Sequence, residues 1–509
     1  MKYIDYIQLN PLQKIGKAMK EFFVNLPANL SKFFKFVGTK IAAFFVMIVM
    51  GFKNYGQTFI EGGWTTKLSY VIMGFGCMIR GQLIKGIVFL SLEVGYFYFM
   101  SSFAWNYLRK LNTLGTVETS TGFNDMGIKE YIYGDNSMLI LLYSVMSIMI
   151  TIGFVAFYIT NIKVAKNCED LQKNGKKPAT IKEDVKDLLD KNYHKTLLTL
   201  PVILVGIFTI LPLIFMILIA FTNYDTNHQV PFKLFTWIGV GNFSDVFFND
   251  PIKADTFQNL LIWTGIWAVI ATFSNYIVGI IFSLMINKKS IKCKAVFRTM
   301  FVLAIAVPQF VSLLLMAQML HANGVVNIIL DDLGIVDQLR HLGLSPMEYD
   351  YIPFLTDPNW ARFTVLVVNM WVGIPYTILI TSGILMNIPE ELYESARIDG
   401  ASPVVTFFKI TMPYMLFVTT PYLIQQFIGN INNFNMIFFL TGGGPANPTY
   451  YSAGDTDILV TWLFKLTTGK NDYALAATIG ILVFIISAFV SLVTFNLSKS
   501  SRNEEEFSW

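Results

Sequence analysis

The sequence predicts an all-α fold, namely a polytopic bundle of about eight membrane-spanning helices. Three observations predict it: 54% of the 509 residues are hydrophobic, only 14% are charged, and the mean hydropathy is +0.52. Soluble domains carry about a quarter charged residues, so a chain of this composition belongs in lipid. The net charge of +4 is small for this length and gives no support to a nucleic-acid-binding protein.

Eight apolar stretches are long enough to cross a hydrocarbon layer of roughly 30 Å. They are Gly86–Trp105, Met138–Tyr158, Leu197–Phe221, Leu260–Ile286, Met300–Leu320, Phe363–Met386, Tyr414–Leu440 and Leu475–Leu497. Because backbone polar groups find no partner in lipid, we expect each stretch to form a helix.

Residues 1–85, which precede the first stretch, are predicted to be cytoplasmic or interfacial. Their apolar run, Ile41–Phe52, is short for a span and is flanked by lysines. An amphipathic helix lying on an anionic leaflet explains both features. A ninth span is the alternative, but it would place the N-terminus outside, against the distribution of lysines.

The distribution of Lys and Arg predicts the orientation in the membrane. Nine lysines lie in 161–195 and five cations lie in 287–298, whereas the four loops on the opposite side share eight cations. Loops rich in Lys and Arg stay in the cytoplasm. We therefore expect a multi-pass protein with both termini in the cytoplasm.

Glu93 lies inside the first predicted span, where an unpaired carboxylate costs several kcal/mol. We expect it to be protonated, paired or turned toward another helix. A proton relay is the alternative, but the sequence offers no second titratable partner nearby.

Metal and catalytic chemistry have little support in the sequence. The four histidines lie in predicted loops or at span edges, and the three cysteines share no metal-ligand spacing. We expect free thiols, no metal site and no catalytic residue, which argues against a membrane enzyme.

The segment 389–413 is predicted to form two short helices separated by a stiff corner. Pro389 suits a first helical turn, Gly400 can adopt the left-handed conformation that ends a helix, and Ser402 with Pro403 can begin the next. Capping chemistry alone is equally compatible with an ordinary helix hairpin.

This segment resembles the "EAA" signature of ABC-importer permeases. The matching positions are Glu394, Ala396, Gly400, Ile410 and Pro413. Ser395 and Met412 depart from the signature by small changes in size or shape. The resemblance implies that this loop docks into a cleft on an ATP-binding-cassette ATPase. The residues implied to couple the chain to that ATPase are Glu394, Ser395, Ala396, Asp399, Gly400 and Pro413.

The chain has no G-x-x-x-x-G-K-[ST] loop with which to hold ATP phosphates. We therefore expect no cofactor in this chain and ATP bound by partner ATPase subunits.

Two predicted spans carry polar side chains on one helix face, at spacings of three, four and seven residues. These are Asn369, Val372, Gly373 and Tyr376 in the sixth span, and Gln426, Gly429, Asn430 and Asn433 in the seventh. Amides facing a hydrated cavity can bind a polyhydroxylated ligand, the glycines leave room for a ring, and Tyr376 offers a stacking face. Helix packing is the alternative explanation.

The runs 369–376 and 430–434 resemble the larger permease subunits of maltose and maltodextrin importers. The resemblance extends over about residues 200–497 and implies that the eight residues line a sugar site within a type I ABC-importer permease fold. Val372, Gln426 and Gly429 stand where those relatives have leucine, serine and phenylalanine.

The resemblance implies a permease subunit of an ATP-driven, binding-protein-dependent importer that moves maltose or maltodextrins by alternating access. The implied location is the bacterial plasma membrane. The implied partners are a second permease subunit, an ATP-binding-cassette ATPase dimer and an extracellular solute-binding protein. On this basis residues 86–196 are peripheral transmembrane helices, 197–497 are the permease core, and 498–509 are a cytoplasmic tail.

Two alternatives remain open for the transported substrate and the source of energy. One is another oligosaccharide, such as galactan fragments. The other is an ion-coupled secondary sugar transporter, for which Glu93 and the number of spans are the only encouragement. A phosphate-bearing solute would need cations that neither polar face contains.

Overall fold

The computed structural model describes residues 53–123, 128–288, 291–344 and 348–497, with residue 346 and some of the residues between 35 and 51. The described chain is helical apart from one hairpin, in which β1 (Ser120–Phe123) pairs antiparallel with β2 (Lys129–Ile132). It divides into two compact units, residues 1–218 with 227–237 and residues 219–226 with 238–509. The predicted all-α class is confirmed.

Seven helices are long and apolar enough to cross a membrane. They are Leu83–Leu108, Ser137–Lys173, Tyr193–Ile219, Pro251–Asn287, Pro358–Met386, Pro403–Ile431 and Tyr473–Thr494. They coincide with seven of the eight predicted stretches. The remaining stretch is divided into α13 (Lys294–Ala306) and α14 (Gln309–Met319) at Val307 and Pro308. Proline lacks an N–H and disfavours a helical conformation in the preceding residue, so the helix breaks at this point.

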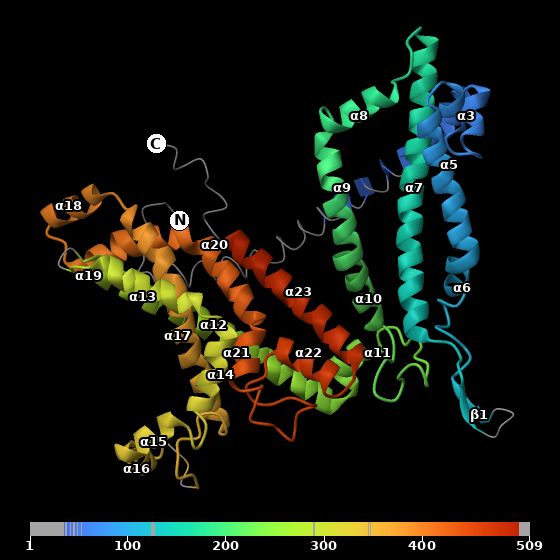
Figure 1. The fold of residues 1–509 in the computed structure, drawn as a ribbon. Coiled ribbons are helices and arrows are strands. Elements are labelled where there is room, and N and C mark those ends of the chain that lie inside the picture. Colours follow the sequence, from blue (N-terminus) through green and yellow to red (C-terminus); the bar gives the residue numbers. More distant parts are fainter. Residues whose placement is uncertain are drawn as a thin grey trace. The chain divides into compact units, whose positions relative to one another are not determined.

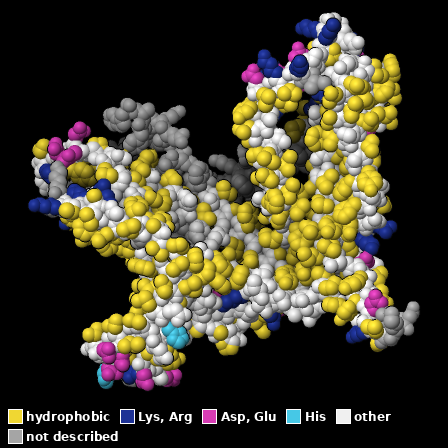
Figure 2. Space-filling model, viewed as in Figure 1, with side chains coloured by type: hydrophobic (Ala, Val, Ile, Leu, Met, Phe, Trp, Pro, Cys, Tyr) yellow, Lys and Arg dark blue, Asp and Glu magenta, His cyan; other side chains and the backbone are white. Residues whose placement is uncertain are grey.

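Hydrophobic side chains cover the flanks of the long helices within each unit, and charged side chains gather near the helix ends (Figure 2). Only 6% of the apolar window in Tyr193–Ile219 and 11% of that in Leu83–Leu108 is buried inside the protein. Apolar helix faces exposed to this extent need lipid or a partner subunit around them. The chain is a multi-pass membrane protein.

The first unit is built on two helices that lie side by side (Figure 1). One is α7 (Ser137–Lys173). The other is α5 (Leu83–Phe99), which continues through the π-helical turn η1 (Met100–Ala104) into α6 (Trp105–Leu108). The short helices α3 (Trp64–Leu68) and α4 (Phe75–Ile79) pack on α7.

Glu93 has a structural partner in this unit. Its Oε2 atom accepts a hydrogen bond of 2.8 Å from the backbone N–H of Met73, and the carboxylate is buried. The next N–H, that of Gly74, donates to Asn161 of α7 at 2.8 Å. The two side chains therefore hold the turn that precedes α4, and Glu93 is paired, which is one of the three expectations for it.

The first unit ends with α8 (Ile181–Leu189) and the long helix made of α9 (Tyr193–Val205), the π-helical turn η2 (Gly206–Ile210) and α10 (Leu211–Ile219). The sequence placed the start of the permease core at residue 197, whereas residues up to 218 group with the first unit. Residues 1–34 and the predicted tail 498–509 lie outside the described residues. The described residues between 42 and 51 are helical and exposed.

The second unit is centred on α12 (Pro251–Asn287), α17 (Pro358–Met386) and α20 (Met412–Ile431) (Figure 1). Both α12 and α17 begin with proline after an aspartate that accepts two backbone N–H groups, Asp250 and Asp357. Helices often begin with a side-chain acceptor at the N-cap and a proline in the first turn.

The second unit has further elements. They are α11 (Gly241–Ser244), η3 (Asp245–Asn249), α15 (Val325–Asp332), α16 (Ile335–His341), α18 (Glu390–Ile398), α19 (Pro403–Thr406), η4 (Phe407–Thr411), α21 (Phe434–Leu440), α22 (Leu459–Thr468) and α23 (Tyr473–Leu497). The predicted stretch 414–440 is thus two helices, α20 and α21, which separate at Asn432.

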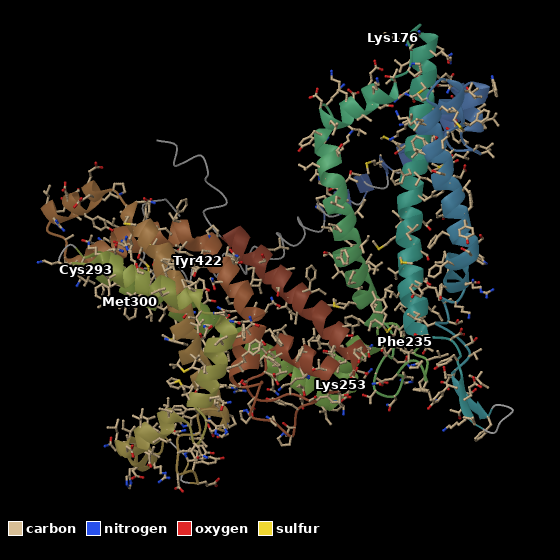
Figure 3. All side chains as sticks on the ribbon, in the orientation of Figure 1. Lys176, Phe235, Lys253, Cys293, Met300 and Tyr422 are labelled. Atoms are coloured by element: carbon tan, nitrogen blue, oxygen red, sulfur yellow. The ribbon has the colours of Figure 1, made fainter. Side chains whose placement is uncertain are left out.

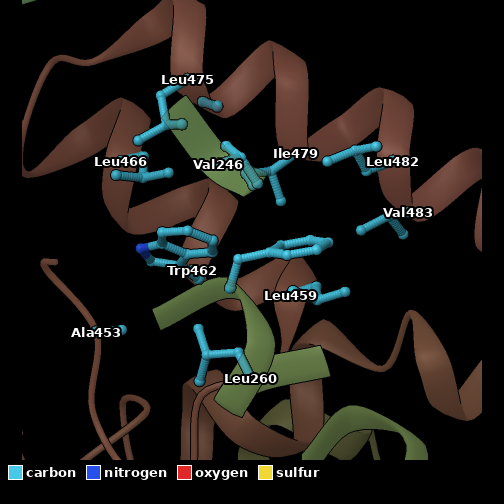
Figure 4. Close-up of a cluster of buried hydrophobic side chains, with 12 residues drawn as sticks. Val246, Leu260, Ala453, Leu459, Trp462, Leu466, Leu475, Ile479, Leu482 and Val483 are labelled. Carbon is cyan, nitrogen blue, oxygen red and sulfur yellow. The ribbon is translucent and has the colours of Figure 1, made fainter. Parts of the chain in front are cut away.

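A buried hydrophobic cluster joins α12, α22, α23 and η3 (Figure 4). Trp462 lies at its centre with no exposed surface, and its indole Nε1 donates to the carbonyl oxygen of Tyr451 at 2.7 Å. Burial of a large aromatic side chain with its polar atom satisfied is strongly stabilising. This cluster fixes the helices at one end of the second unit.

The glycine-rich turn 441–445 is part of the same end and serves packing. Gly442 and Gly443 have φ of +60° and +78°, and a Cβ atom on Gly443 would overlap the carboxylate of Asp457. That carboxylate pairs with Lys465 at 2.6 Å and accepts the N–H of Gly454 at 2.7 Å. Only glycine permits both the backbone conformation and this close approach.

Candidate functional site

A cavity of about 210 Å³ lies within the second unit, among α12, α14, α17 and α20. Its lining residues are Thr272, Asn275, Tyr276, Gln309, Asn369, Val372, Gly373, Tyr376, Thr377, Tyr422, Leu423, Gln426, Asn430 and Asn433. These side chains carry amides, hydroxyls and aromatic rings, and no residue of this lining is charged. The cavity suits a neutral, hydrogen-bonding ligand.

The predicted polar face of the sixth span lines this cavity with all four of its residues, Asn369, Val372, Gly373 and Tyr376 of α17. Asn369 is 4% exposed, and its Nδ2 atom is buried with no hydrogen-bond partner among the described residues. Tyr376 is half exposed. An unpaired buried amide is costly, so this donor is suited to a bound acceptor.

The seventh span contributes three of its four predicted residues, Gln426 and Asn430 of α20 and Asn433, which caps α21. Gly429 is exposed and is absent from the lining, because it lies at the edge of the helix face that Gln426 and Asn430 share. The prediction that Gly429 lies in the site is therefore not matched by the geometry.

Asn430 and Asn433 use part of their hydrogen-bonding capacity inside the protein. Asn430 Nδ2 donates to Thr272 Oγ1 at 2.9 Å, and its backbone carbonyl accepts from Trp267 Nε1 at 2.9 Å. Asn433 Oδ1 accepts the N–H of Met436 at 3.3 Å, which starts α21. These amides therefore hold helices together as well as line the cavity.

Gly373 has a different role from the one expected. The sequence suggested that glycine leaves room for a ligand ring, but a Cβ atom on Gly373 would overlap the side-chain amide of Asn275 from α12. The absence of a side chain lets Asn275 approach the backbone of α17.

Sequence reasoning missed the third wall of the cavity, formed by Thr272, Asn275 and Tyr276 of α12. These residues have the same spacing of three and four as the two predicted faces, which was a usable signal. Gln309 was also missed. Gln309 is the first residue of α14, directly after the break at Pro308. The length of an apolar run could not show that this residue lines the cavity.

Two hydroxyl contacts join helices of the cavity wall. Tyr276 and Thr419 lie 2.6 Å apart through their hydroxyls and join α12 to α20. Thr377 and Tyr422 lie 3.3 Å apart and join α17 to α20. Tyr422 is labelled on α20 in Figure 3. Each contact lies one to two helical turns from the amides, in the direction of α18.

The segment between α17 and α20 has the predicted corner. α18 ends in a Schellman motif, in which Gly400 has φ of +74° and donates to the carbonyl of Arg397, while Ala401 donates to that of Ala396. Ser402 caps α19 through the N–H of Val405 at 3.3 Å. Pro389 is the residue before α18, which begins at Glu390.

The structure places the predicted coupling residues as follows. Glu394, Ser395 and Ala396 lie on α18, Asp399 and Gly400 form its end, and Pro413 lies in the first turn of α20. Only Ala396 is buried, and the other five are exposed. Ile398 is 87% exposed beside them. An exposed apolar residue on a short polar helix marks a surface that a partner could cover.

Among the described residues, no group of three His, Cys, Asp or Glu side chains could hold a metal ion. Cys77 and Cys168 are buried and Cys293 is exposed, all three as free thiols.

Comparison with known proteins identifies the family to which the chain belongs. A model of the family described as "Binding-protein-dependent transport system inner membrane component" matches residues 275–503, which include the α17 and α20 faces of the cavity and the α18 corner. The galactooligosaccharides transport system permease protein of Bacillus subtilis (strain 168) is 34% identical over 437 residues, covering 85% of this chain and 97% of that protein.

Two further relatives match with similar identity. The maltodextrin transport system permease protein of the same organism is 33% identical, covering 86% of this chain and 95% of that protein. The maltose/maltodextrin transport system permease protein of Vibrio cholerae serotype O1 is 36% identical over 270 residues, covering 52% of this chain and 49% of that protein. All three are named as permease proteins, which are membrane subunits rather than enzymes. The chain therefore belongs to the family of binding-protein-dependent transport system inner membrane components, the permeases of ABC importers.

Proposed function

We propose that this chain is the permease subunit through which an ATP-driven importer moves neutral oligosaccharides of the maltodextrin type by alternating access. The observation that carries the proposal is the uncharged, amide-lined cavity between helices that cross the membrane. Sugar hydroxyls both donate and accept, as side-chain amides do, and a pyranose ring can stack on the exposed face of Tyr376.

The names of the relatives support an oligosaccharide as the transported solute. They leave two candidates for the kind of oligosaccharide. One relative is named for maltodextrin and another for galactooligosaccharides, at 33% and 34% identity over nearly the same share of the chain. A galactooligosaccharide is therefore the second candidate substrate. Both are neutral and rich in hydroxyls, which fits a cavity without a cation to pair with phosphate or carboxylate.

The path of the chain supports coupling to a motor. α18 lies in sequence between α17 and α20, the two helices that carry the amide faces. An ATPase dimer that grips the exposed face of α18 would move these helices relative to each other. We place this corner and both termini in the cytoplasm, with the lysine-rich loops, and we assign a second permease subunit and an extracellular solute-binding protein as the remaining partners.

Alternating access has a physical basis in the hydroxyl contacts between the cavity and α18. The bonds between Tyr276 and Thr419 and between Thr377 and Tyr422 each join two helices at short range. Hydroxyl bonds of this kind contribute about 1 kcal/mol each, so a lever movement can exchange them for water. Their rupture would open the cavity toward the cytoplasm.

The test uses the complete importer reconstituted in liposomes, with uptake of labelled maltooligosaccharides and galactooligosaccharides measured in competition. Asn369→Ala should reduce uptake at least tenfold, because its unpaired Nδ2 is lost without breaking a bond inside the protein. Thr364→Val is the matched control, since Thr364 is buried on the same helix, is likewise unpaired among the described residues, and does not line the cavity.

Asn430→Ala should also abolish sugar-stimulated uptake with the complex assembled. It is the less clean variant, because it removes the bond to Thr272. Wild-type uptake by both Asn369→Ala and Asn430→Ala would refute the sugar site. Uptake driven by an ion gradient in liposomes that hold the isolated chain and no nucleotide would refute the ATP-driven mechanism.

A further inference from the structure

The wall that α12 contributes to the cavity holds one side chain with no assigned role. Thr272 accepts from Asn430 and Tyr276 pairs with Thr419, so the hydroxyls of both residues are engaged within the protein. Asn275 lies between them, and its Oδ1 atom is buried without a partner among the described residues. Asn275 is a lining residue of the same cavity as Asn369.

Two residues that line one cavity from neighbouring helices thus each carry a buried, unpaired amide atom. Asn275 Oδ1 on α12 is an acceptor, and Asn369 Nδ2 on α17 is a donor. Most buried polar groups in proteins are hydrogen-bonded, because an unmet donor or acceptor costs about 1–3 kcal/mol. A neutral ligand that carries hydroxyl groups satisfies both kinds of atom, since each hydroxyl donates once and accepts as well.

The backbone of α17 holds Asn275 in place. Its side-chain amide lies against Gly373, where any Cβ atom would overlap it. The contact fixes the amide on a rigid helix, which is the preorganisation that a specific polar site needs. Gly373 therefore acts on the cavity through Asn275.

We propose that Asn275 binds the transported sugar directly and sets specificity for its hydroxyl groups, with Gly373 as the residue that positions it. This inference rests on the proposed function, because it names a further residue of the same site. If Asn275 binds the sugar, the substrate must be an oligosaccharide with a free ring hydroxyl that faces α12. A sugar deoxygenated or alkylated at that hydroxyl leaves the acceptor of Asn275 unpaired and is rejected.

The first experiment measures sugar uptake by the full importer in liposomes, with saturating sugar-loaded binding protein. Asn275→Ala should lower the initial rate of uptake roughly tenfold while the importer still assembles. Ser274→Ala is the control, because Ser274 neighbours it on α12 and has a buried unpaired hydroxyl outside the cavity lining. Equal losses for Ser274→Ala and Asn275→Ala would assign the effect to helix packing and overturn the proposal.

A double-substitution cycle tests the positioning role of Gly373. Gly373→Ala should reduce uptake in the wild type, because the added methyl group displaces Asn275. In the Asn275→Ala background the methyl group has room, so Gly373→Ala should cost nothing further. Additive losses would show that Gly373 contacts the sugar by itself and would overturn the positioning role.

A panel of monodeoxy maltooligosaccharides tests specificity. At least one member should be transported roughly tenfold more slowly than the parent sugar by the wild type, and equally well by Asn275→Ala. Should Asn275→Ala fail to assemble, Asn275→Leu keeps a side chain of similar shape and lacks the acceptor, so it too should transport the discriminated member as well as the parent sugar.

The outcomes separate this inference from the proposed function. A wild-type importer that transports neutral oligosaccharides, combined with unchanged rate and ranking in Asn275→Ala or Asn275→Leu, overturns the inference alone. A wild-type importer that moves no neutral oligosaccharide overturns the proposed function and this inference with it.

Discussion

The hydroxyl groups of Tyr393 and Thr411 lie 3.0 Å apart and join α18 to the turn from which α20 begins. Thr411 is buried, and Tyr393 is partly buried. The corner is therefore tied to α20 by a side-chain contact as well as by the chain itself. We therefore expect a movement of α18 to reach the helix that carries Gln426 and Asn430.

Tyr393→Phe should uncouple ATP hydrolysis from transport. The substitution removes one hydroxyl bond worth about 1 kcal/mol, so we expect the sugar transported per ATP hydrolysed to fall severalfold while the subunits remain assembled. Uptake and phosphate release in the same liposomes measure the ratio. Tyr414→Phe is the control, because Tyr414 lies on α20 and makes no hydrogen bond that the described residues show. An unchanged ratio in Tyr393→Phe would mean that this bond transmits nothing.

Gly400→Pro should prevent association with the ATPase. Proline fixes φ near −65°, whereas Gly400 has φ of +74°, and its N–H donates to the carbonyl of Arg397 at 3.0 Å. The substitution therefore breaks the Schellman motif and redirects the chain after α18. Co-purification of the ATPase and its stimulation by sugar-loaded binding protein measure the effect.

Gly383→Ala is the matched control, because Gly383 lies in α17 with open space around it. It should leave association intact. Normal co-purification and ATPase stimulation by Gly400→Pro would contradict the role assigned to this corner.

Glu93→Gln should leave transport and stability unchanged. The glutamine oxygen can still accept the N–H of Met73, which Glu93 accepts at 2.8 Å, and the side chain no longer titrates. Glu93→Leu should lower stability by about 1–3 kcal/mol, since it leaves that N–H unpaired. Uptake assays and thermal melting measure both variants. A stable Glu93→Gln protein without uptake would favour proton transfer through Glu93 and an ion-coupled mechanism.

The sequence predicted the helical class, seven of the spans and the corner at Gly400 because each has a local cause. Long apolar runs must satisfy their backbone within one helix, and a glycine after a polar helix can adopt positive φ. The breaks at Pro308 and Asn432 lie inside apolar runs, so a search for span length passed over them. The contact-based grouping puts residues up to 218 with the first unit, which the sequence could not show because grouping depends on contacts between distant residues.

Seven of the eight residues named from the sequence line the cavity. Helix periodicity placed them on common helix faces, and the family resemblance implied that those faces line a site. Periodicity could not place Gly429, which lies at the edge of that face, or show that Gly373 faces Asn275 on another helix. Contacts between helices depend on their packing, which the period of a single helix does not contain. Whether these residues bind sugar stays a prediction for the assays above.

Asp472→Asn should stabilise the protein at neutral pH. Asp472 precedes α23, accepts the N–H of Leu475 at 3.1 Å and the hydroxyl of Tyr451 at 3.1 Å, and is 7% exposed. Burial raises the pKa of this carboxyl above its usual value, and the hydrogen bonds only partly offset the rise. Asparagine has the same size, keeps the acceptor for Leu475 and carries no charge to desolvate.

The sign of the pH dependence follows from proton binding. Because the pKa is higher in the folded state, the folded protein binds more protons than the unfolded chain between the usual carboxyl value and the raised one. The free energy of unfolding therefore falls as pH rises through that interval and stays lower above it. Asp472→Asn lacks this fall, so its melting temperature should exceed that of the wild type at neutral pH, and the difference should shrink in acid.

Asp357→Asn, which replaces the cap of α17, is the control and should not raise the melting temperature at neutral pH. Identical melting curves for wild type and Asp472→Asn at both pH values would contradict a buried, destabilising charge at this helix start.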